Sequence, residues 1–381
     1  MNNLLDNIAI DKGKDKKVSI FRQIERQIRL KMIMGELNTG DKLPTVSDMV
    51  NSFKVDYRTA NEALKVLENK GLIHIPKGRG KKPTVLSNGD LNSHKDLRVS
   101  VSYIRWNIDP MGMQIASGMN EFARNSLKCV DLRIVDAHGD IDSYFNLLLN
   151  STSNGIITGA YDTPDFRNVV SQLLENNKKL LFIDRMLSDL SVNCISIDHI
   201  DGAYHATKHL LMEHKMPVYY LGCDVFNGAS ASEDRFYGWK TAMIECGFSD
   251  LGQYVLSESA DNYKTINQVN IAYERALQLF KEQRNKQFSL FAINDFVAKE
   301  VYAAADAAGL RIGKDVFVVG FGDYPFCEQL PVALTSVKQF NKIVGHEAIK
   351  LLVQSALFGS SGYVYYKIPS ELVIRESSVC S

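Results

Sequence analysis

Hydrophobic residues recur at every fourth position near the start of the chain, which is the spacing of an amphipathic helix. The repeat consists of Ile20, Ile24, Ile28 and Met32. We expect Ser19 to cap this helix and Gly35 to end it. The opposite face carries Arg22, Arg26 and Arg29. The pattern therefore predicts a helix with one packed face and one basic face.

Two shorter helices are predicted directly after it. Thr45 followed by Asp48 is a capping-box pattern, which begins a helix over 46–53. Asp56 is the expected N-cap of a further helix that buries alanine and leucine and stops before Gly71. Two helices joined by so tight a link form a helix-turn-helix, whose second helix lies in the major groove of DNA.

A basic hairpin follows the third helix. The runs LIHI and PTV flank the tip KGRGKK, in which Gly78 and Gly80 permit a tight turn. We expect this wing to present its lysines and arginine to phosphates. At the start of the third helix, Arg58 and Asn61 can read base edges, and Tyr57 or Thr59 can bind phosphates.

From Val99 the pattern changes to short β-rich runs, each followed by an amphipathic helical stretch. The runs are VSVSYI, VDLRIV, GIIT, LLFI, CISI, VYYLG, SLFAI and VFVVG. The helical stretches include MQIASGMNEFARN, GAYHATKHLLMEH and FVAKEVYAAADAAG. This alternation predicts an α/β domain in which parallel sheets carry helices on both faces.

Polar residues directly after these runs are candidates for a ligand site, because ligands bind at the carboxyl ends of parallel strands. Their carboxylates, amide and guanidinium groups suit hydroxyl groups, and an aromatic ring can cover the apolar face of a sugar. The candidates are Arg105, Trp106, Asp184, Arg185, Arg235, Asn294 and Asp323. Asp295, directly after Asn294, is a further polar residue behind the run SLFAI. Each candidate has a structural alternative: Asp295 caps its helix, Asp184 and Arg185 form an ion pair, and Trp106 belongs to the core.

Positive and negative residues are distributed unevenly along the chain, although the formal net charge is zero. Residues 11–82 hold 17 lysines and arginines against 9 acidic residues, whereas residues 83–381 hold 27 against 34. The asymmetry indicates a polyanion contact near the N-terminus. The alternative is a solvated lysine-rich tail, since four of these basic residues lie within 12–17.

The remaining composition narrows the class of protein. A length of 381 residues and a hydrophobic fraction of 45% predict a folded protein with more than one unit. The first residues lack the apolar core of an export signal, and we expect a cytoplasmic protein without membrane spans. We expect reduced thiols, without a metal site or cofactor, because the cysteines are scattered. They are Cys129, Cys194, Cys223, Cys246, Cys327 and Cys380.

Two resemblances cover most of the chain. VSIFRQIERQIRLKMIMGELNTGDKLPTVSDMV and VDYRTANEALKVLENKGLIHIPKGRG resemble the GntR-type winged helix. LFIDRMLSD, EDRFYGWKTAMIECG, LTSVKQ and IPSELVIRES resemble the LacI/GalR-type sensor, which has the two-lobed periplasmic-binding-protein fold. The joint layout resembles that of arabinose-repressor-type regulators. The implied division is a flexible basic tail (1–17), a winged helix (18–85), a linker (86–96) and an effector-binding and dimerisation domain (97–377).

The resemblances also imply site residues. For DNA the resemblance implies contacts at Ser47, Tyr57, Thr59, Asn61, Lys77 and Gly78. Together with the candidates from the pattern itself, the predicted DNA-binding residues are Thr45, Ser47, Tyr57, Arg58, Thr59, Asn61, Lys77, Gly78 and Arg79. For the effector they imply Asp184, Arg235 and Asn294, with Asp323 adjacent. The chain departs from the family where arginine is usual, at Ser47, Tyr57 and Asn61, and where an acidic ligand is usual, at Gly322.

The function expected on these grounds is a sugar-responsive repressor. A homodimer would bind a pseudo-palindromic operator, and a monosaccharide or sugar phosphate would bind between the lobes. One alternative is an enzyme acting on a small carbohydrate, but the nucleophile-elbow, phosphate-loop and zinc-helix motifs are missing from the sequence. A second is an exported solute-binding protein, which the missing signal and the DNA reader disfavour.

Overall fold

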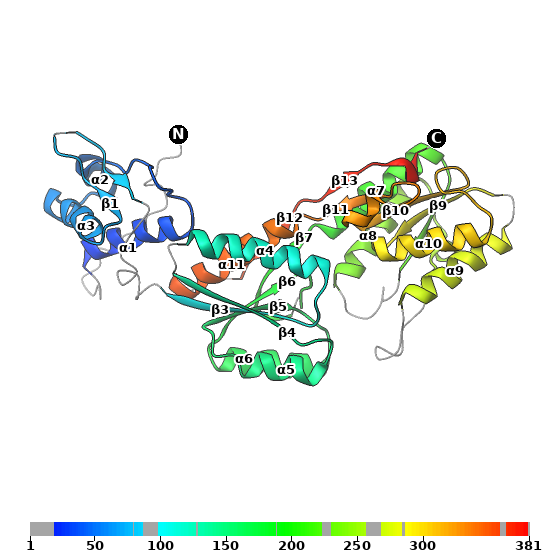
Figure 1. Ribbon diagram of the computed structural model, residues 1–381, viewed down its shortest axis with the longest axis horizontal. Helices are drawn as coiled ribbons and strands as arrows, with labels where there is room; N and C mark the ends of the chain where they lie inside the picture. The colour runs from blue at the N-terminus through cyan, green and yellow to red at the C-terminus, as the bar shows by residue number, and fades with distance from the viewer. Residues whose placement is uncertain are drawn as a thin grey trace.

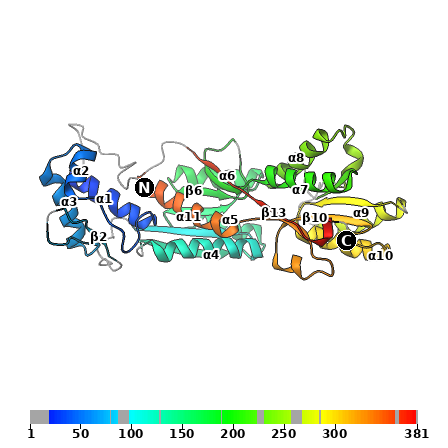
Figure 2. The ribbon, with the colours of Figure 1, turned by 90° about the horizontal axis from the view of Figure 1, so that it is seen from above.

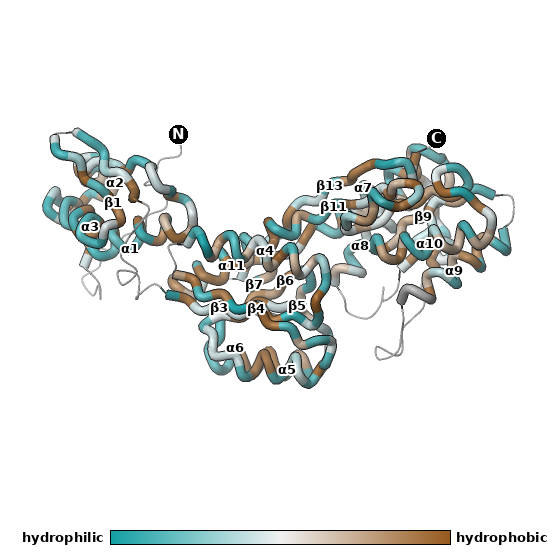
Figure 3. The backbone as a smooth tube through the Cα atoms, in the orientation of Figure 1, coloured by the Kyte–Doolittle hydropathy of each residue, from teal (hydrophilic) through white to brown (hydrophobic). Residues whose placement is uncertain are grey.

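The computed structural model contains a small N-terminal domain and two α/β lobes, which lie in a row with the small domain at one end (Figure 1, Figure 2). It describes residues 19–78, 80–86, 98–126, 129–187, 189–222, 230–256, 268–283, 286–358 and 363–379. The predicted tail, Arg79 and nearly all of the predicted linker lie outside these residues. Hydrophobic stretches gather along the strands of both sheets (Figure 3).

The small domain has the predicted order of elements. Thr45 and Asp48 form the expected capping box, and Asp56 caps the third helix by accepting a hydrogen bond from the Thr59 N–H. Ser19 occupies the N-cap position but makes no side-chain cap, so that detail of the prediction is wrong. The elements are α1 (Ile20–Ile33), α2 (Val46–Phe53), α3 (Tyr57–Asn69), β1 (Ile73–His74) and β2 (Thr84–Val85), the two strands being antiparallel.

The first lobe is a six-stranded parallel sheet with the strand order β12-β7-β6-β5-β3-β4. Helices α4 and α11 cover one face and α5 and α6 the other (Figure 1). The strands are β3 (Val99–Arg105), β4 (Val130–Asp136), β5 (Gly155–Gly159), β6 (Lys179–Ile183), β7 (Asn193–Ile197) and β12 (Tyr365–Ile368). The helices are α4 (Pro110–Asn125), α5 (Ile141–Leu149), α6 (Pro164–Glu175) and α11 (Asn341–Phe358).

The second lobe is a five-stranded sheet with the order β13-β11-β10-β9-β8, in which only the β11–β13 pair is antiparallel. Its strands are β8 (Val218–Leu221), β9 (Phe288–Ala292), β10 (Val316–Gly322), β11 (Thr335–Lys338) and β13 (Glu371–Val373). Its helices are α7 (His199–His214), α8 (Ser230–Glu245), α9 (Gln268–Glu282) and α10 (Asp295–Ala307). The prediction of two largely parallel sheets flanked by helices is confirmed.

The chain crosses between the lobes three times, after β7, after β11 and after β12. The crossings after β7 and β12 lie side by side, because the Asp198 N–H donates to the Ile368 carbonyl (2.8 Å). The crossing after β11 begins beside the end of the crossing after β12, because Lys338 at the end of β11 pairs with Glu371 at the start of β13. Three adjacent connections permit one lobe to rotate against the other as a hinge.

Helix α1 packs on both faces, contrary to the prediction of a basic face. Ile24, Ile28 and Met32 join the core of the small domain. Leu30 and Ile33 instead pack against Cys129 and Leu357 of the first lobe. Arg26 donates to the Leu357 carbonyl (3.1 Å), and Arg29, which is 1% exposed, pairs with Glu25 (3.0 Å). The arginines of this face are therefore engaged within the protein, and only Arg22 is exposed.

Two glycines allow α4 and α11 to cross closely. A Cβ atom at Gly118 would lie 1.9 Å from the Lys342 carbonyl oxygen, and one at Gly345 would lie 1.9 Å from the Ile115 carbonyl oxygen. Backbone atoms on both sides leave no flexible group that could yield. The two helices therefore need glycine at both positions.

We expect Gly118→Ala to lower the free energy of unfolding by about 1–3 kcal/mol, because the added methyl group forces the two helices apart. In a helix without this crossing, the same change would raise stability by about 1 kcal/mol. Urea unfolding gives the measurement. Ser117, which precedes Gly118 and is exposed, provides the control. Ser117→Ala should change the free energy of unfolding by no more than about 0.5 kcal/mol. Equal stability of the two variants would contradict the packing argument.

The structure also bears on metals and membranes. Within the described ranges, no helix is long and apolar enough to cross a bilayer. The same ranges contain no group of three His, Cys, Asp or Glu residues that could hold a metal ion. The cysteines described are free thiols, namely Cys129, Cys194, Cys246 and Cys327. Cys223 and Cys380 lie outside the described residues.

Candidate functional sites

The first turn of α3 is open to solvent. The Asp56 carboxylate accepts from the Thr59 N–H (2.8 Å) and from the Thr59 hydroxyl (2.7 Å), which fixes the start of the helix. Tyr57 is 62% exposed, and Arg58 beside it is also exposed. Asn61 lies one turn later and is half-buried. This arrangement presents a phenol, a guanidinium and an amide beside the positive end of a helix dipole, which suits an anionic partner.

Thr45 and Ser47 lie at the start of α2. The Thr45 hydroxyl donates to the Asp48 carboxylate (2.8 Å) and accepts from the Asp48 N–H (3.2 Å), so its role within the protein is to begin the helix. These bonds hold the pKa of Asp48 below its usual value. Ser47 is exposed and has no such structural role among the described contacts.

The wing carries exposed cations on a turn that contains two glycines with positive φ angles. Lys77, Lys81 and Lys82 are exposed around the tip. Gly78 and Gly80 have φ angles of 123° and 77°, in the region that favours glycine. Arg79 lies outside the described residues. The tip therefore combines a backbone that only glycine adopts easily with several positive charges, which is suited to a phosphate backbone.

A cavity of about 170 Å³ lies at the carboxyl ends of β3, β5 and β6 in the first lobe. The structure brings four predicted residues together in its wall: Arg105, Trp106, Asp184 and Arg185. The wall also contains Tyr103, Asn107, Asp109, Tyr161 and Gly159. Charged groups, an amide and aromatic rings thus converge at the edge of a parallel sheet, where such folds bind ligands.

Arg105 is held in place by Asp136. Its Nε and Nη2 atoms donate to the two carboxylate oxygens (2.7 and 3.0 Å), and the side chain is 10% exposed. Its Nη1 atom is buried and has no hydrogen-bond partner among the described residues. Because an unmade hydrogen bond from a buried charged group is costly, Nη1 is a ready donor for a ligand oxygen in this cavity.

Aromatic rings form another part of the wall. Trp106 meets Tyr144 edge-on, with ring centroids 5.7 Å apart, and lies 6.0 Å from Tyr161. The Arg185 guanidinium lies over the Tyr161 ring at 5.4 Å. Trp106 is only partly buried, so it both packs against the lobe and borders the cavity. Flat aromatic surfaces of this kind can cover the apolar face of a sugar ring.

Asp184, His199 and Arg235 form a chain of hydrogen bonds between the lobes. Asp184 Oδ1 lies 3.0 Å from His199 Nε2, and Arg235 Nε donates to His199 Nδ1 at 3.3 Å. Arg235 also donates through Nη1 to the Ile293 carbonyl (2.8 Å), and its guanidinium lies 4.1 Å over the Phe321 ring. Predicted contacts from both lobes are therefore linked through a histidine.

The electrostatics of this chain follow from burial and charge. Burial alone would raise the pKa of Asp184, but the hydrogen bond to His199 and the nearby positive groups hold it well below its usual value. Burial and the adjacent Arg235 charge lower the pKa of His199. Asp184 is thus ionised and His199 neutral at pH 7. Asp184 also has a φ angle of 66°, which is uncommon for a residue with a side chain.

The other predicted effector contacts have partners inside the second lobe. Asn294 caps α10 by accepting from the Val297 N–H (2.9 Å). Asp323 pairs with Arg375 (2.8 Å) and is not among the residues that line the cavity. Asp295 is not the cap but a fully buried carboxyl group, bonded to the Ser336 hydroxyl and the Tyr324 N–H.

Asp295 also explains the glycine that stands at a usual acidic position. A Cβ atom at Gly322 would lie 2.9 Å from Asp295 Oδ2. Gly322 has a φ angle of 139°, which further disfavours a side chain. The buried carboxyl group of Asp295 therefore occupies the space that an acidic side chain at position 322 would need.

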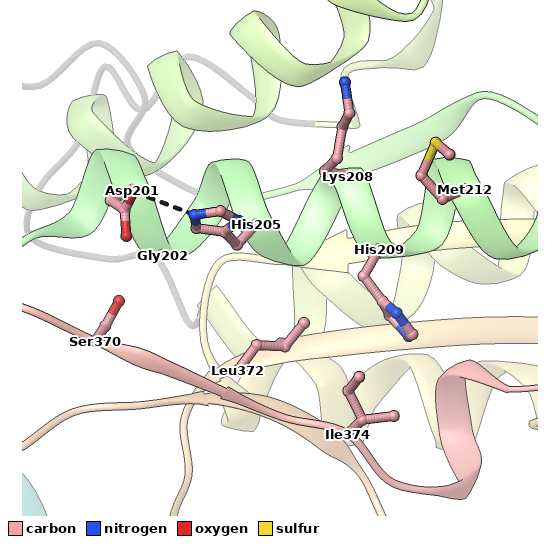
Figure 4. Close-up of a pocket in the computed structure, with 9 residues that line it drawn as sticks. All are labelled: Asp201, Gly202, His205, Lys208, His209, Met212, Ser370, Leu372 and Ile374. Atoms are coloured by element: carbon pink, nitrogen blue, oxygen red, sulfur yellow. Dashed lines mark ion pairs between the residues drawn. The ribbon is translucent and has the colours of Figure 1, made fainter.

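A second cavity of about 340 Å³ lies between α7 and β13 in the second lobe (Figure 4). His209 points from α7 toward Ile374, and Lys208 points away from it (Figure 4). The polar groups have partners within the chain: His205 pairs with Asp201 (3.3 Å), Lys208 with Glu245 (3.3 Å) and His209 with Ser378 (2.8 Å). Satisfied groups make this cavity a weaker ligand site than the one at the strand ends.

Sequence reasoning missed two residues of the site, His199 and Tyr161. Both follow β-rich runs, as the residues that were named do. Tyr161 comes after GIIT, and His199 comes two residues after CISI. Both residues could therefore be predicted from the sequence, because ligands bind at the carboxyl ends of parallel strands and both residues follow such a strand.

Comparison with known proteins matches both parts of the chain. Residues 21–82 match the bacterial regulatory proteins of the gntR family, and residues 207–378 match the periplasmic binding protein-like domain. The arabinose metabolism transcriptional repressor of Geobacillus stearothermophilus is 24% identical over 375 residues, which cover 96% of this chain and 99% of that protein.

Solved structures share the fold. One is a LacI family transcriptional regulator from Enterococcus faecium with bound ribose, with a TM-score of 0.60 and 20% sequence identity. The superposition covers 74% of this chain and 98% of the regulator. The transcriptional regulator CelR–cellobiose complex has a TM-score of 0.62 and 18% identity, and covers 91% and 99%. The chain therefore joins a GntR-type DNA-binding domain to a periplasmic-binding-protein-like domain, and its relatives include transcriptional repressors of arabinose metabolism and of a ribose operon.

Proposed function

We propose that this protein is a sugar-responsive repressor that binds a pseudo-palindromic operator as a homodimer and acts in the cytoplasm. One observation carries the proposal: a single chain holds an exposed helix-turn-helix with a basic wing and a separate cavity with charged and aromatic walls. A two-fold dimer would place two readers on the two halves of an operator.

The DNA roles divide by chemistry. Arg58 and Asn61 would read base edges in the major groove, since guanidinium and amide groups form paired hydrogen bonds with guanine and adenine. Tyr57, Thr59 and Ser47 would bind phosphates beside them, and Thr45 would set the start of α2. Lys77, Gly78 and Arg79 would follow the backbone from the wing.

The effector would be a monosaccharide or a sugar phosphate. Arg105 Nη1 and Asp184 offer a donor and an acceptor on one lobe, and Arg235 and Asn294 lie on the other. Trp106 and Tyr161 would cover the ring, and Arg185 would suit a phosphate. The repressor of arabinose metabolism and the structure with ribose support a monosaccharide, while the cellobiose complex supports only a sugar in general.

Sugar binding would close the lobes and change the separation of the two DNA readers. DNA and sugar would then compete through conformation, with a coupling of roughly 1–3 kcal/mol. Reciprocity requires that the operator weaken sugar binding by the same factor by which sugar weakens operator binding.

A thermal-shift panel tests the effector. The pure protein is heated with L-arabinose, D-ribose, cellobiose and ribose 5-phosphate, since a ligand that binds only the folded state raises the melting temperature. We expect one class of sugar to raise it and to release an operator selected from random DNA. A panel without any shift would contradict the sugar sensor and leave DNA binding standing. Turnover of a sugar would favour an enzyme instead.

Substitutions on the two DNA-contacting surfaces should have different effects. We expect Arg58→Ala to weaken binding to the selected operator by about 10- to 100-fold and to relax base preference at one position. Lys77→Ala should weaken selected and random DNA about equally and reduce the salt slope by about one. Titrations of both DNAs at several salt concentrations give the measurement. The same loss on both DNAs for Arg58→Ala would contradict its role as a base reader.

A further inference from the structure

His199 is the only fully buried histidine among the described residues, and it stands where the two lobes meet. It begins α7 in the second lobe, directly after the crossing at Asp198. Its ring touches one predicted effector contact from each lobe, Asp184 at the end of β6 and Arg235 on α8. The role inferred for His199 rests on the proposed function, because it concerns how that site is held.

The hydrogen bonds determine the state of the ring. Arg235 Nε can only donate, so His199 Nδ1 must be the acceptor. His199 Nε2 then carries the hydrogen and donates to Asp184 Oδ1. A neutral imidazole with one hydrogen on Nε2 satisfies both neighbours. The other neutral tautomer and the charged ring would each place a hydrogen against the Arg235 donor.

The same bonds leave particular atoms for a ligand. Arg235 is held through Nε by His199, through Nη1 by the Ile293 carbonyl and across its face by Phe321. Among the described residues, this leaves Nη2 and the second hydrogen of Nη1 as its available donors. Asp184 uses Oδ1 for His199, while its Oδ2 has only a distant ion pair with Arg185 (4.0 Å).

We propose that His199, as its neutral Nε2–H tautomer, is the positioning residue that holds Asp184 and Arg235 for one ligand bound between the lobes. Asp184 then presents an acceptor and Arg235 a donor, which together suit one ligand hydroxyl that donates and one that accepts. A residue without hydrogen-bonding atoms at position 199 would leave a carboxylate and a guanidinium without the partner that orients them.

Crystal structures of two variants test the positioning directly, without any ligand. His199→Leu keeps an apolar side chain in a buried space but removes both hydrogen bonds, and His199→Gln keeps one donor and one acceptor. We expect the Asp184 and Arg235 side chains to change rotamer in His199→Leu and to stay in place in His199→Gln. His205→Leu, on the same helix but exposed, is the matched control and should leave both in place. Unchanged rotamers in His199→Leu would overturn the proposal.

Binding of L-arabinose, D-ribose, cellobiose and ribose 5-phosphate to the full-length variants gives the functional measurement. For whichever sugar binds the wild type, His199→Leu should bind about 10- to 100-fold more weakly, while His199→Gln should stay much closer to the wild type. Equal affinity of His199→Leu and wild type would overturn the proposal. If the wild type binds none of them, the proposed function fails, and the crystal structures still decide the role of His199.

The wild type offers a readout that does not depend on a variant that folds. With ¹⁵N-labelled histidine, the ring nitrogens of His199 report the tautomer, and comparison with His199→Gln assigns the signal. We expect a protonated Nε2 and an unprotonated Nδ1 at pH 7. A hydrogen on Nδ1, or a charged ring, would exclude the arrangement and overturn the proposal.

Discussion

Replacing Asp184 by alanine should abolish the response to sugar and lower the free energy of unfolding by about 3–5 kcal/mol. The reason is that Arg235 is 9% exposed and His199 fully buried, and both lose the carboxylate to which they are linked. A buried positive charge without its partner is among the costliest single changes a fold can suffer. Urea unfolding measures the stability, and operator titrations with and without the sugar that acts on the wild type measure the response.

Asp189 provides the control for this substitution. It also lies in the first lobe and also pairs with an arginine, Arg167 (2.6 Å), but its side chain is 60% exposed. Exposed ion pairs contribute about 0–1 kcal/mol, so Asp189→Ala should leave both stability and sugar response nearly unchanged. If the two variants lose the same free energy of unfolding, the buried hydrogen bonds from Asp184 to Arg235 do not stabilise the fold more than an exposed ion pair does.

The acidic range gives a further check on the same carboxylate. Because the folded-state pKa of Asp184 is below its usual value, its contribution is complete above pH of about 3.9 and declines as the pH falls toward the folded-state pKa. The difference in stability between wild type and Asp184→Ala should therefore be full at neutral pH. It should shrink only in strong acid.

The strands show which parts of the fold the sequence could predict. All eight β-rich runs form strands, and most of them are continuous apolar runs, as a parallel strand covered on both faces requires. Three further strands, β11, β12 and β13, were not predicted. Tyr365 and Tyr366 of β12 are exposed, and β13 is an antiparallel edge strand. In β11, Thr335 and Ser336 are fully buried but use their hydroxyls in hydrogen bonds, so the strand looks polar.

The sites show a second limit, which is contact between distant residues. The position of Arg105 and Asp184 beside one cavity follows from a local rule about strand ends. That Asp323 pairs with Arg375, or that Arg26 donates to Leu357, depends on which segments meet after folding. No spacing along the chain encodes those pairs, so the basic face of α1 was a wrong expectation, and the effector contact at Asp323 stays a prediction.

The second large effect concerns the junction between the small domain and the first lobe. Helix α11 begins at one of the crossings between the lobes and ends beside α1, as seen in Figure 2. There Leu357 packs against Leu30 and Ile33, which are 2% and 1% exposed. A packed helix that connects a hinge to a DNA reader is a physical route by which closure of the lobes could move that reader.

We therefore expect the double variant Leu30→Ala, Ile33→Ala to bind operator and sugar but to lose the coupling between them. In the wild type we expect the sugar to change operator affinity by about 5- to 150-fold, which is the usual range of allosteric coupling. In the variant this factor should approach one. Sugar affinity with and without operator, and operator affinity with and without sugar, give the measurement. Ile343→Ala, an exposed apolar site at the other end of α11, is the control and should retain the wild-type factor.

Reciprocity makes this test strict. At equilibrium the sugar must weaken operator binding by the same factor by which the operator weakens sugar binding, whatever path connects the two sites. A variant with a broken junction must therefore lose both factors together. If both persist at the wild-type value, the contact between α1 and α11 holds the domain in place without transmitting closure. The signal would then have to reach α3 through the separation of the two protomers of the proposed homodimer instead.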